Sequence, residues 1–205
     1  MQRLDAFALG FVLAKYHIDA TQEWGSFSHD GVIYCLAHLD AHEVVFEGEN
    51  DTYEFIVTYG LHCFAKDDSE HNIPVSVNDG RESRLVDLER YEASKHLRHI
   101  IEKLHMTQEK IYETAVDKYF TMRLLNSKSG QEEPYKVCLA MYKENRKLRI
   151  HVTSAFFPRD GKEGSVDNPV NPKTRKGFSV FKIAKDVKGA SNKRSGPKEV
   201  FNRRR

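Results

Sequence analysis

The stretch YEFIVTYGLHCFAK, residues 53–66, decides how the rest of the chain is interpreted. From Tyr53 to Leu61 every second residue is aromatic or aliphatic, and the positions between them include Thr58 and His62. This period of two is typical of a strand with one face turned to a core and another of mixed polarity. The stretch therefore predicts a long strand in a half-buried sheet.

Shorter alternating or apolar runs on both sides of this strand predict its companions in the sheet. They lie at residues 31–36, 44–46, 73–77, 120–124, 135–141, 148–154 and 178–183. Pro74 assigns its run to a sheet edge, because proline cannot donate a ladder hydrogen bond in a central strand. Between residues 120 and 154 the runs are joined by short polar turns, which is typical of an antiparallel meander.

One segment, residues 87–106, has the period of an amphipathic helix. Its apolar positions follow a spacing near 3.6 residues and are Leu88, Tyr91, Leu97, Ile100, Ile101 and Leu104. Asp87 suits the N-cap, because its carboxylate can accept from a free amide of the first turn. Together the patterns predict an α+β fold with one mostly antiparallel sheet of five to seven strands and this long helix packed on one face.

Length and composition indicate one folded domain with an appendage at each end. The chain has 205 residues, of which 40% are hydrophobic and 30% are charged. Residues 1–30 are expected to hold a short apolar helix, at 4–17, and a polar linker. Residues 31–183 then form the α+β domain, and residues 184–205 form a basic, disordered tail.

Two features of the sequence bear on its location. No run approaches the about 20 apolar residues of a membrane helix, and the N-terminus lacks the pattern of a signal peptide. The three cysteines, Cys35, Cys63 and Cys138, include no C-x-x-C pair and fit a reducing compartment. A cytoplasmic protein without membrane contact is therefore expected.

Positive charge is concentrated at the C-terminal end. Residues 171–205 hold 12 Lys and Arg against 2 Asp and Glu, whereas residues 1–170 hold 20 against 28. Such a cluster can bind nucleic-acid phosphates, and Phe178, Phe181 and Phe201 could stack on bases. It could equally fold back on the acidic body or be only a solvated end. The candidate nucleic-acid-binding residues are Lys173, Arg175, Lys176, Lys182, Lys185, Lys188, Lys193, Arg194, Lys198, Arg203, Arg204 and Arg205.

The positions between the apolar residues of the predicted strands form a second, polar face of the sheet. If the strands are neighbours, this face carries the candidate catalytic residues His62, Arg149, His151 and Thr153, with Thr58, Thr121 and Arg123 beside them. Two imidazoles and a guanidinium suit metal-independent cleavage of a phosphodiester, because imidazoles move protons near neutral pH and arginine stabilises the charge of the phosphorane. A solvated sheet face carries the same polar residue types with no catalytic role, so both interpretations stay open.

Two other groups contain the residue types of metal ligands. They are Glu92, His96 and His99 in the predicted helix, and Cys35, His38 and His42 around the first predicted strands. Neither group supplies the four ligands of a structural zinc site. A solvated helix face and a core cysteine beside loop histidines explain them better, so neither a metal nor a cofactor is predicted.

Three blocks of sequence resemble a family of uncharacterised bacterial proteins often met in prophages and other mobile elements. The blocks are YGLHCFAK at 59–66, LERYEASK at 88–95 with Ile100 and Ile101, and LRIHVTSAF at 148–156. The similarity covers about residues 30–185 and departs from the family pattern at residues 97–99, where a proline is expected. It implies no activity. A looser likeness, to small toxin ribonucleases, rests on the helix against an antiparallel sheet and on the strand end at 152–155.

Two functions from different classes follow. In the first, the protein acts on RNA as a metal-independent ribonuclease of the toxin type. His62 and His151 then form the acid and base, Arg149 stabilises the phosphate, and the tail is an electrostatic anchor. In the second, it is a non-enzymatic module of a mobile element that binds DNA, RNA or a host protein. The positions of His62 and His151 in the folded protein distinguish the two, because an acid and a base must reach the same phosphate.

Overall fold

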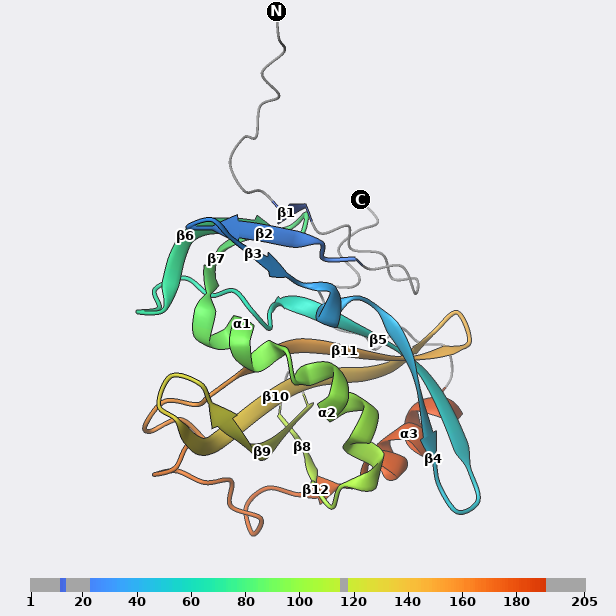
Figure 1. Ribbon diagram of the computed structural model, residues 1–205. Helices are drawn as coiled ribbons and strands as arrows, with labels where there is room; N and C mark the ends of the chain where they lie inside the picture. Colours follow the sequence, from blue (N-terminus) through green and yellow to red (C-terminus); the bar gives the residue numbers. More distant parts are fainter. Residues whose placement is uncertain (1–11, 14–22, 115–117, 191–205) are drawn as a thin grey trace, which may run out of the picture.

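The predicted sheet is present and has seven strands. The computed structural model describes residues 12–13, 23–114 and 118–190 of the chain. Within these residues the sheet has the order β12-β8-β9-β10-β11-β5-β4, and Figure 1 shows it curling behind the helices. Its strands are β4 (His42–Glu47), β5 (Thr52–His62), β8 (Ile111–Glu113), β9 (Lys118–Asn126), β10 (Gln131–Glu144), β11 (Lys147–Phe156) and β12 (Gly177–Phe178).

Pairing in this sheet is antiparallel at every step except one. β9, β10 and β11 form the predicted meander, and β4 pairs antiparallel with β5. The exception is β11 with β5, which are parallel. The predicted fold class, a mostly antiparallel sheet with a helix on one face, is therefore confirmed.

The turn between β10 and β11 consists of Asn145 and Arg146, and both have positive φ, at 48° and 66°. Two positive φ angles in a two-residue hairpin turn give a twist that matches the flanking strands. Asparagine tolerates this conformation well, whereas arginine adopts it at a steric cost that glycine would not have. Arg146 is therefore not the residue that backbone geometry alone would favour here.

The predicted helix is present as three consecutive pieces. They are α1 (Leu88–Ser94), α2 (Leu97–Lys103) and the 3-10 turn η2 (Leu104–Met106), with a turn at Lys95 and His96 between the first two. Asp87 is the N-cap, as predicted, and its carboxylate accepts from the Arg90 amide at 3.0 Å. Its predicted start is thus confirmed, and the interruption between α1 and α2 was not predicted.

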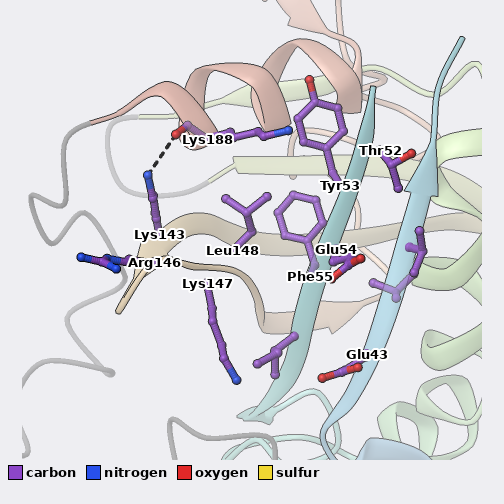
Figure 2. A pocket seen from close by; sticks show the side chains of 13 residues that line it. Glu43, Thr52, Tyr53, Glu54, Phe55, Lys143, Arg146, Lys147, Leu148 and Lys188 are labelled. Atoms are coloured by element: carbon purple, nitrogen blue, oxygen red, sulfur yellow. Dashed lines mark hydrogen bonds between the residues drawn. The ribbon is translucent and has the colours of Figure 1, made fainter. Parts of the chain in front are cut away.

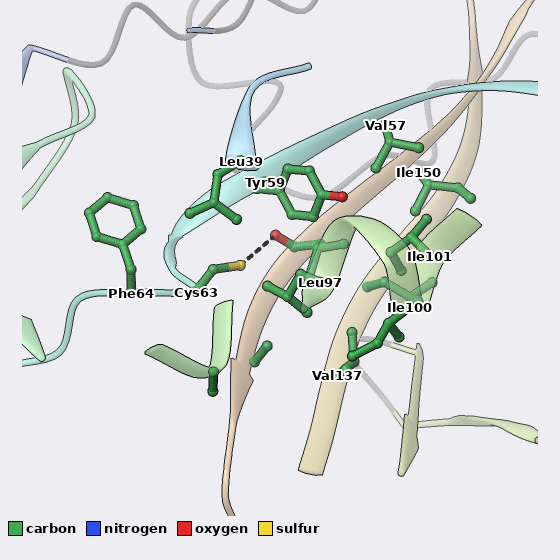
Figure 3. Close-up of a cluster of buried hydrophobic side chains, with 14 of the residues drawn as sticks. Leu39, Val57, Tyr59, Cys63, Phe64, Leu97, Ile100, Ile101, Val137 and Ile150 are labelled. Carbon is green, nitrogen blue, oxygen red and sulfur yellow. Dashed lines mark hydrogen bonds between the residues drawn. The ribbon is translucent and has the colours of Figure 1, made fainter. Parts of the chain in front are cut away.

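The main core lies between the sheet and these helices. Figure 3 shows Leu97 and Ile101 of α2 facing Val57 and Tyr59 of β5. The alternate residues of the neighbouring strands, among them Val137 and Ile150, belong to the same buried cluster. Cys63, just after β5, is also buried there, and its thiol donates to the Val152 carbonyl at 3.5 Å. One continuous face of the sheet is therefore apolar, as its period of two predicts.

Two smaller sheets lie at one end of the main sheet in Figure 1. They comprise β1 (Val12–Leu13), β6 (Asn72–Asn78) and β7 (Ser83–Asp87) in the first, and β2 (Ser26–His29) and β3 (Val32–Cys35) in the second, with the 3-10 turn η1 (Ala37–Leu39) after them.

These sheets correct two predictions. β6 is not an edge strand, since it lies between β1 and β7, but Pro74 falls where neither partner is in register with it. The expected N-terminal helix is wrong at residues 12–13, which form a strand parallel to β6, and its other positions lie outside the described residues. The apolar residues around positions 12–13 suggested a helix, but pairing with the distant strand β6 determines their structure.

The predicted last strand, residues 178–183, is wrong over most of its length. β12 ends at Phe178, and α3 (Val180–Gly189) follows. The hydroxyl of Ser179 caps this helix by accepting from the Lys182 amide at 3.2 Å. A short apolar run fits a strand or a helix equally well, and the Ser179 cap with buried Ile183 one turn later is the signal for the helix. Residues 184–189 of the predicted tail are helical, and residues 191–205 lie outside the described residues.

Removal of Leu97 is expected to destabilise the protein strongly. Its side chain is fully buried between α2 and the sheet. Leu97→Ala is expected to lower the free energy of unfolding by about 2–5 kcal/mol, because lost burial and a cavity act together. Urea unfolding followed by circular dichroism measures this change. Met106→Ala, at an exposed site on η2, is the control, expected to change stability by less than about 0.5 kcal/mol. Equal effects of the two substitutions would contradict this account of the core.

Candidate functional site

Parallel pairing of β5 with β11 builds a polar pocket at the C-terminal end of the two strands. Their register places His151 opposite Thr58 and Ser154 opposite His62, with an irregularity between Val152 and Ser154. A cavity of about 270 Å³ opens there. We call it the polar pocket, and its lining consists of Gly60, Leu61, His62, Arg81, Arg90, His151, Thr153 and Ser154.

Three of the four predicted catalytic residues, His62, His151 and Thr153, line this one pocket. The fourth, Arg149, does not, because the register places it opposite Ile56, nearer the start of the strands. Its guanidinium Nε lies 3.9 Å from the carboxylate of Glu144.

Thr121 and Arg123 do not line the polar pocket either. They are on β9, and β10 separates that strand from β11. The residues of the predicted polar face are therefore spread over several strands, and the polar pocket lies at the β5–β11 pair.

The second face of the β5–β11 pair is not the solvated surface that a simple alternation suggests. Thr58, Arg149 and His151 are only 6%, 3% and 1% exposed. Near His151 the β6–β7 turn lies close, since its Arg81 and Asp79 both influence the pKa of that imidazole. The pair is therefore buried on both faces, and polar groups on its second face need partners within the protein.

His151 is held as a neutral imidazole. Its Nδ1 shares a hydrogen bond of 2.8 Å with the Thr58 hydroxyl. Burial lowers the pKa of His151 to about 3, Arg81 lowers it further, and Asp79 opposes them. At neutral pH this side chain can accept or donate a hydrogen bond, but it carries no proton that it could deliver as an acid.

His62, at the end of β5, is partly exposed and is tied to the neighbouring hairpin. Its Nε2 lies 2.9 Å from Glu82 Oε1, and the other oxygen of that carboxylate accepts from Arg84. Its backbone carbonyl accepts from the guanidinium of Arg90 at 2.7 Å. His62 thus links the end of the sheet to the β6–β7 turn and to α1.

Two arginines that the sequence analysis did not select, Arg81 and Arg90, complete the polar pocket. Arg90 belongs to α1, and its guanidinium lies 5.0 Å from the centre of the Phe156 ring. Arg81 is in the β6–β7 turn and donates to Asp79 at 2.7 Å. No sequence pattern separates Arg90 from an ordinary helix-surface arginine, because its role depends on a contact with the distant residue His62.

Gly60 makes the base of the polar pocket possible. A Cβ at this position would lie 2.9 Å from the Thr153 carbonyl oxygen and 3.4 Å from the His151 ring. The first distance is shorter than real Cβ atoms show, so a side chain here would push β5 and β11 apart. The glycine that interrupts the predicted strand therefore marks a close approach of two backbones.

A second depression, which we call the basic groove, lies at the opposite end of the same strand pair. It has a volume of about 930 Å³ and is bordered by the starts of β5 and β11, the end of β10, β4 and α3. Figure 2 shows Lys143, Arg146 and Lys147 on the β10–β11 side of the groove and Glu43 and Glu54 across from them. Lys188 of α3 completes the set of four cations.

The four groove cations have no carboxylate within 4.0 Å among the residues that the structure describes. Lys143 donates to the Lys188 carbonyl at 3.1 Å, and the Lys188 ammonium lies 5.0 Å from the centre of the Tyr53 ring. These contacts position the two ammonium groups but do not neutralise them. The groove therefore keeps a local positive charge.

Six of the twelve predicted nucleic-acid-binding residues lie in the described part of the chain. Of those described, Lys188 alone lines the basic groove. Arg175 is paired with Glu163 at 2.7 Å, and Lys182 is paired with Asp186 at 2.5 Å. Lys173, Lys176 and Lys185 lie outside the groove lining, and Lys193, Arg194, Lys198, Arg203, Arg204 and Arg205 are outside the described residues. Lys143, Arg146 and Lys147 were not predicted as binding residues, since they occur in a stretch of ordinary mixed charge.

Neither histidine group that resembles metal ligands forms a metal site. Within the described residues, no three His, Cys, Asp or Glu side chains converge as ligands. His38 is bonded to the Ser94 hydroxyl at 2.8 Å, and His42 stacks on Tyr59. Cys35 is exposed, contrary to the core cysteine expected at this position, while burial raises the pKa of Cys63 to about 12.

These features define a mixed α+β protein with a polar pocket and a basic groove at opposite ends of one parallel strand pair. The sequence model of the YjaZ family matches residues 26–188, and the chain belongs to that family. Protein YjaZ of Escherichia coli (strain K12) is 33% identical over 146 residues, which cover 66% of this chain and 80% of that protein. Among solved structures, none gives a significant match.

The predicted membership of a bacterial protein family is confirmed by these matches. The association with mobile elements and the likeness to toxin ribonucleases stay predictions. No helix in the described ranges has both the length and the apolar character that crossing a membrane requires.

Acidification is expected to destabilise the protein through its buried histidines. Their ordinary pKa is 6.5, whereas burial lowers the pKa of His151 to about 3 and that of His38 to about 4. Below pH 6.5 the unfolded chain therefore binds protons that the folded protein does not. Above that pH the free energy of unfolding is fully retained. As the pH decreases from 6.5 towards the folded pKa values, the free energy of unfolding falls by at most about 1.4 kcal/mol per pH unit for each histidine.

Urea unfolding at pH 7 and at pH 5 measures this loss. His151→Gln is expected to lose less stability between the two pH values than the parent protein, because one of the depressed groups is gone. His99→Gln, at an exposed position of α2, is the matched control for removing a histidine. A variant with His151→Gln that shows the parent's full pH dependence would contradict the role given to this imidazole.

Proposed function

We propose that this protein binds nucleic acid without cleaving it, through the basic groove and the basic segment that follows Ala190. The observation that carries the proposal is the set of four cations in the groove, which lack a carboxylate partner in the described part of the chain. A phosphate that binds such cations releases counterions and displaces no internal ion pair. Cations in this state are therefore the ones best suited to a polyanion.

Several other surface cations of the protein are paired with carboxylates. Lys95 is paired with Glu92 at 2.7 Å, and the Arg84 guanidinium contacts both Asp67 and Glu82. A phosphate would have to compete with these carboxylates. The groove brings four cations without such a partner together in one depression, and this clustering supports it as the binding surface.

The turn residue Arg146 adds an independent argument. It occupies a left-handed backbone position, φ 66°, that glycine fills at no steric cost. A charged side chain at such a position is consistent with selection for the charge rather than for the turn. The side chain lies on the basic groove.

The sequence beyond α3 continues the same charge. α3 ends at Gly189, one residue after Lys188, and the chain then carries Lys193, Arg194, Lys198 and the final Arg203, Arg204 and Arg205. The groove residue Lys188 thus precedes the basic segment by only a few positions. The proposal uses only the charge of this segment and its closeness in sequence to the groove, which can add phosphate contacts.

Neutralising the groove is expected to weaken nucleic-acid binding and its dependence on salt. The variant replaces Lys143, Arg146 and Lys147 by Gln, and fluorescence anisotropy with labelled single-stranded RNA and double-stranded DNA measures affinity across a salt series. If all three cations contact phosphates of a single strand, the slope of log K against log salt should fall by about 2. Deletion of residues 191–205 should reduce the slope further.

Two controls separate this effect from a general loss of charge or of folding. Replacing Lys95, Arg98 and Lys103 by Gln removes equal charge from the helical side and should leave the affinity nearly unchanged. Arg146→Gly should weaken binding while its stability to urea is maintained or raised, because glycine suits the turn. Binding that has no salt dependence, or that both triple variants reduce equally, would rule out the groove.

A metal-independent ribonuclease is the second candidate, favoured by the position of His62, His151 and Thr153 on one pocket. His151 would be a weak base, since burial lowers its pKa to about 3, and Arg90 would take the part expected of Arg149. This weak proton acceptor is the reason for preferring binding over cleavage.

Incubation of RNA with the purified protein in EDTA tests the second candidate. Cleavage that is lost in both His62→Ala and His151→Ala would establish the nuclease and replace the binding proposal. Intact RNA, or cleavage that persists in both variants, would exclude these residues as acid and base. An association with mobile elements, also proposed, is checked by the genes that neighbour this one.

A further inference from the structure

We propose that the polar pocket binds a small phosphate-bearing molecule. The cavity, about 270 Å³, is below the roughly 300–1,000 Å³ of pockets for drug-sized ligands, so it suits a phosphate with a small organic group. Its lining combines two arginines, two histidines and two hydroxyls. The inference goes beyond the proposed nucleic-acid binding and does not depend on it.

Arg90 supplies the first reason to expect an anion. Its side chain makes one hydrogen bond within the described residues, to the His62 carbonyl, and packs over Phe156. No carboxylate of those residues lies within 4.0 Å of it. Burial lowers the pKa of Arg90, which means that lost hydration penalises its charge. A bound oxyanion would restore the favourable interactions of that guanidinium.

Arg81 approaches the same cavity from a turn that is already ordered. The fully buried carboxylate of Asp79 accepts from the amides of Arg81 and Glu82 at 2.9 and 3.0 Å, and from the Arg81 guanidinium at 2.7 Å. One charge of Arg81 is thereby balanced by Asp79, and the charge of Arg90 gives the cavity an excess of one cation. Asp79 holds the Arg81 side chain in place before any ligand arrives, which reduces the entropy lost on binding.

Hydroxyl groups of β11 provide the remaining donors. The Thr153 Oγ1 is buried and has no hydrogen-bond partner within the described residues. A buried hydroxyl without a partner is costly, and a ligand oxygen would satisfy it. Ser154 is the adjacent lining residue, and neutral His151 can also donate a hydrogen bond, since its pKa is low and one ring nitrogen keeps its proton.

The arrangement favours phosphate over carboxylate. Donors come from three separate elements, namely α1, the β6–β7 turn and β11, so they surround the cavity. A tetrahedral group directs its oxygens towards several sides at once, whereas a planar carboxylate directs two oxygens to one side. Gly60 keeps the base of the cavity open, since any side chain there would meet the Thr153 backbone.

The polar pocket and the basic groove can be tested separately, because they lie at opposite ends of β5 and β11 and share no lining residue. Isothermal titration calorimetry on the full chain is the measurement, with inorganic phosphate, glycerol 3-phosphate and acetate as probes. We expect the two phosphates to bind at one site and acetate to bind at least tenfold more weakly.

Variants locate the site. Arg90→Gln is expected to weaken phosphate binding about tenfold or more, because a charge-assisted hydrogen bond is lost. Thr153→Val keeps the shape of the side chain, leaves the arginines in place and should weaken binding about threefold to tenfold. The groove variant of Lys143, Arg146 and Lys147 should bind phosphate as the parent does, and Arg90→Gln should bind RNA as the parent does.

Three outcomes would overturn the inference. They are no binding of either phosphate to the parent protein, acetate binding as strong as phosphate binding, and unchanged phosphate affinity in folded Thr153→Val. Circular dichroism establishes that each variant is folded, and Thr153→Val keeps the test decisive if Arg90→Gln fails to fold. A fourth outcome, loss of phosphate binding in the groove variant, would also overturn it, by showing that the basic groove and not the polar pocket holds the anion.

Discussion

The parallel pairing of β5 with β11 is the constraint on which the rest of the structure depends. It joins the β4–β5 hairpin to the β9–β10–β11 meander and so makes one sheet from two separate antiparallel units. Its register determines which residues of the two strands are neighbours, and Gly60 allows the backbones of β5 and β11 to approach closely. Because both strands start together and end together, the pair has two distinct ends, one basic and one polar.

Alternation along single strands was sufficient to predict much of this architecture. The period of two at Tyr53–Leu61 assigned one set of residues to the core and the other, with His62, to the second face, and the structure agrees. Asp87 predicted the helix start correctly, because an N-cap depends on a local contact. Its carboxylate accepts from the amide of Arg90, three residues later. Features that are determined within a few residues of the chain could therefore be recognised without the fold.

Features that depend on distant contacts could not be recognised in this way. Nothing in residues 148–154 indicates that their second neighbour is β5 or that the pairing is parallel, so Arg149 was grouped with His151 although the pocket excludes it. Arg90 was overlooked for the same reason, since its distinctive contact is with the carbonyl of His62. The error at residues 178–183 differs in kind, because the apolar run itself is compatible with both a strand and a helix.

Burial on both faces also limits what chemistry the centre of the sheet can perform. Desolvation holds His151 neutral, and its Nδ1 is engaged with Thr58, so this imidazole is better suited to fixing the positions of its neighbours than to exchanging protons. The two proposals therefore rest on the ends of the strand pair, where the four groove cations and Arg90 have no carboxylate within 4.0 Å among the described residues. At one end they lie on an open groove and suit an extended polyanion, and at the other they surround a small cavity and suit a single oxyanion. In the two proposals, the same strand pair thus presents an open groove at one end and a small cavity at the other, and this difference in geometry separates two kinds of anion recognition.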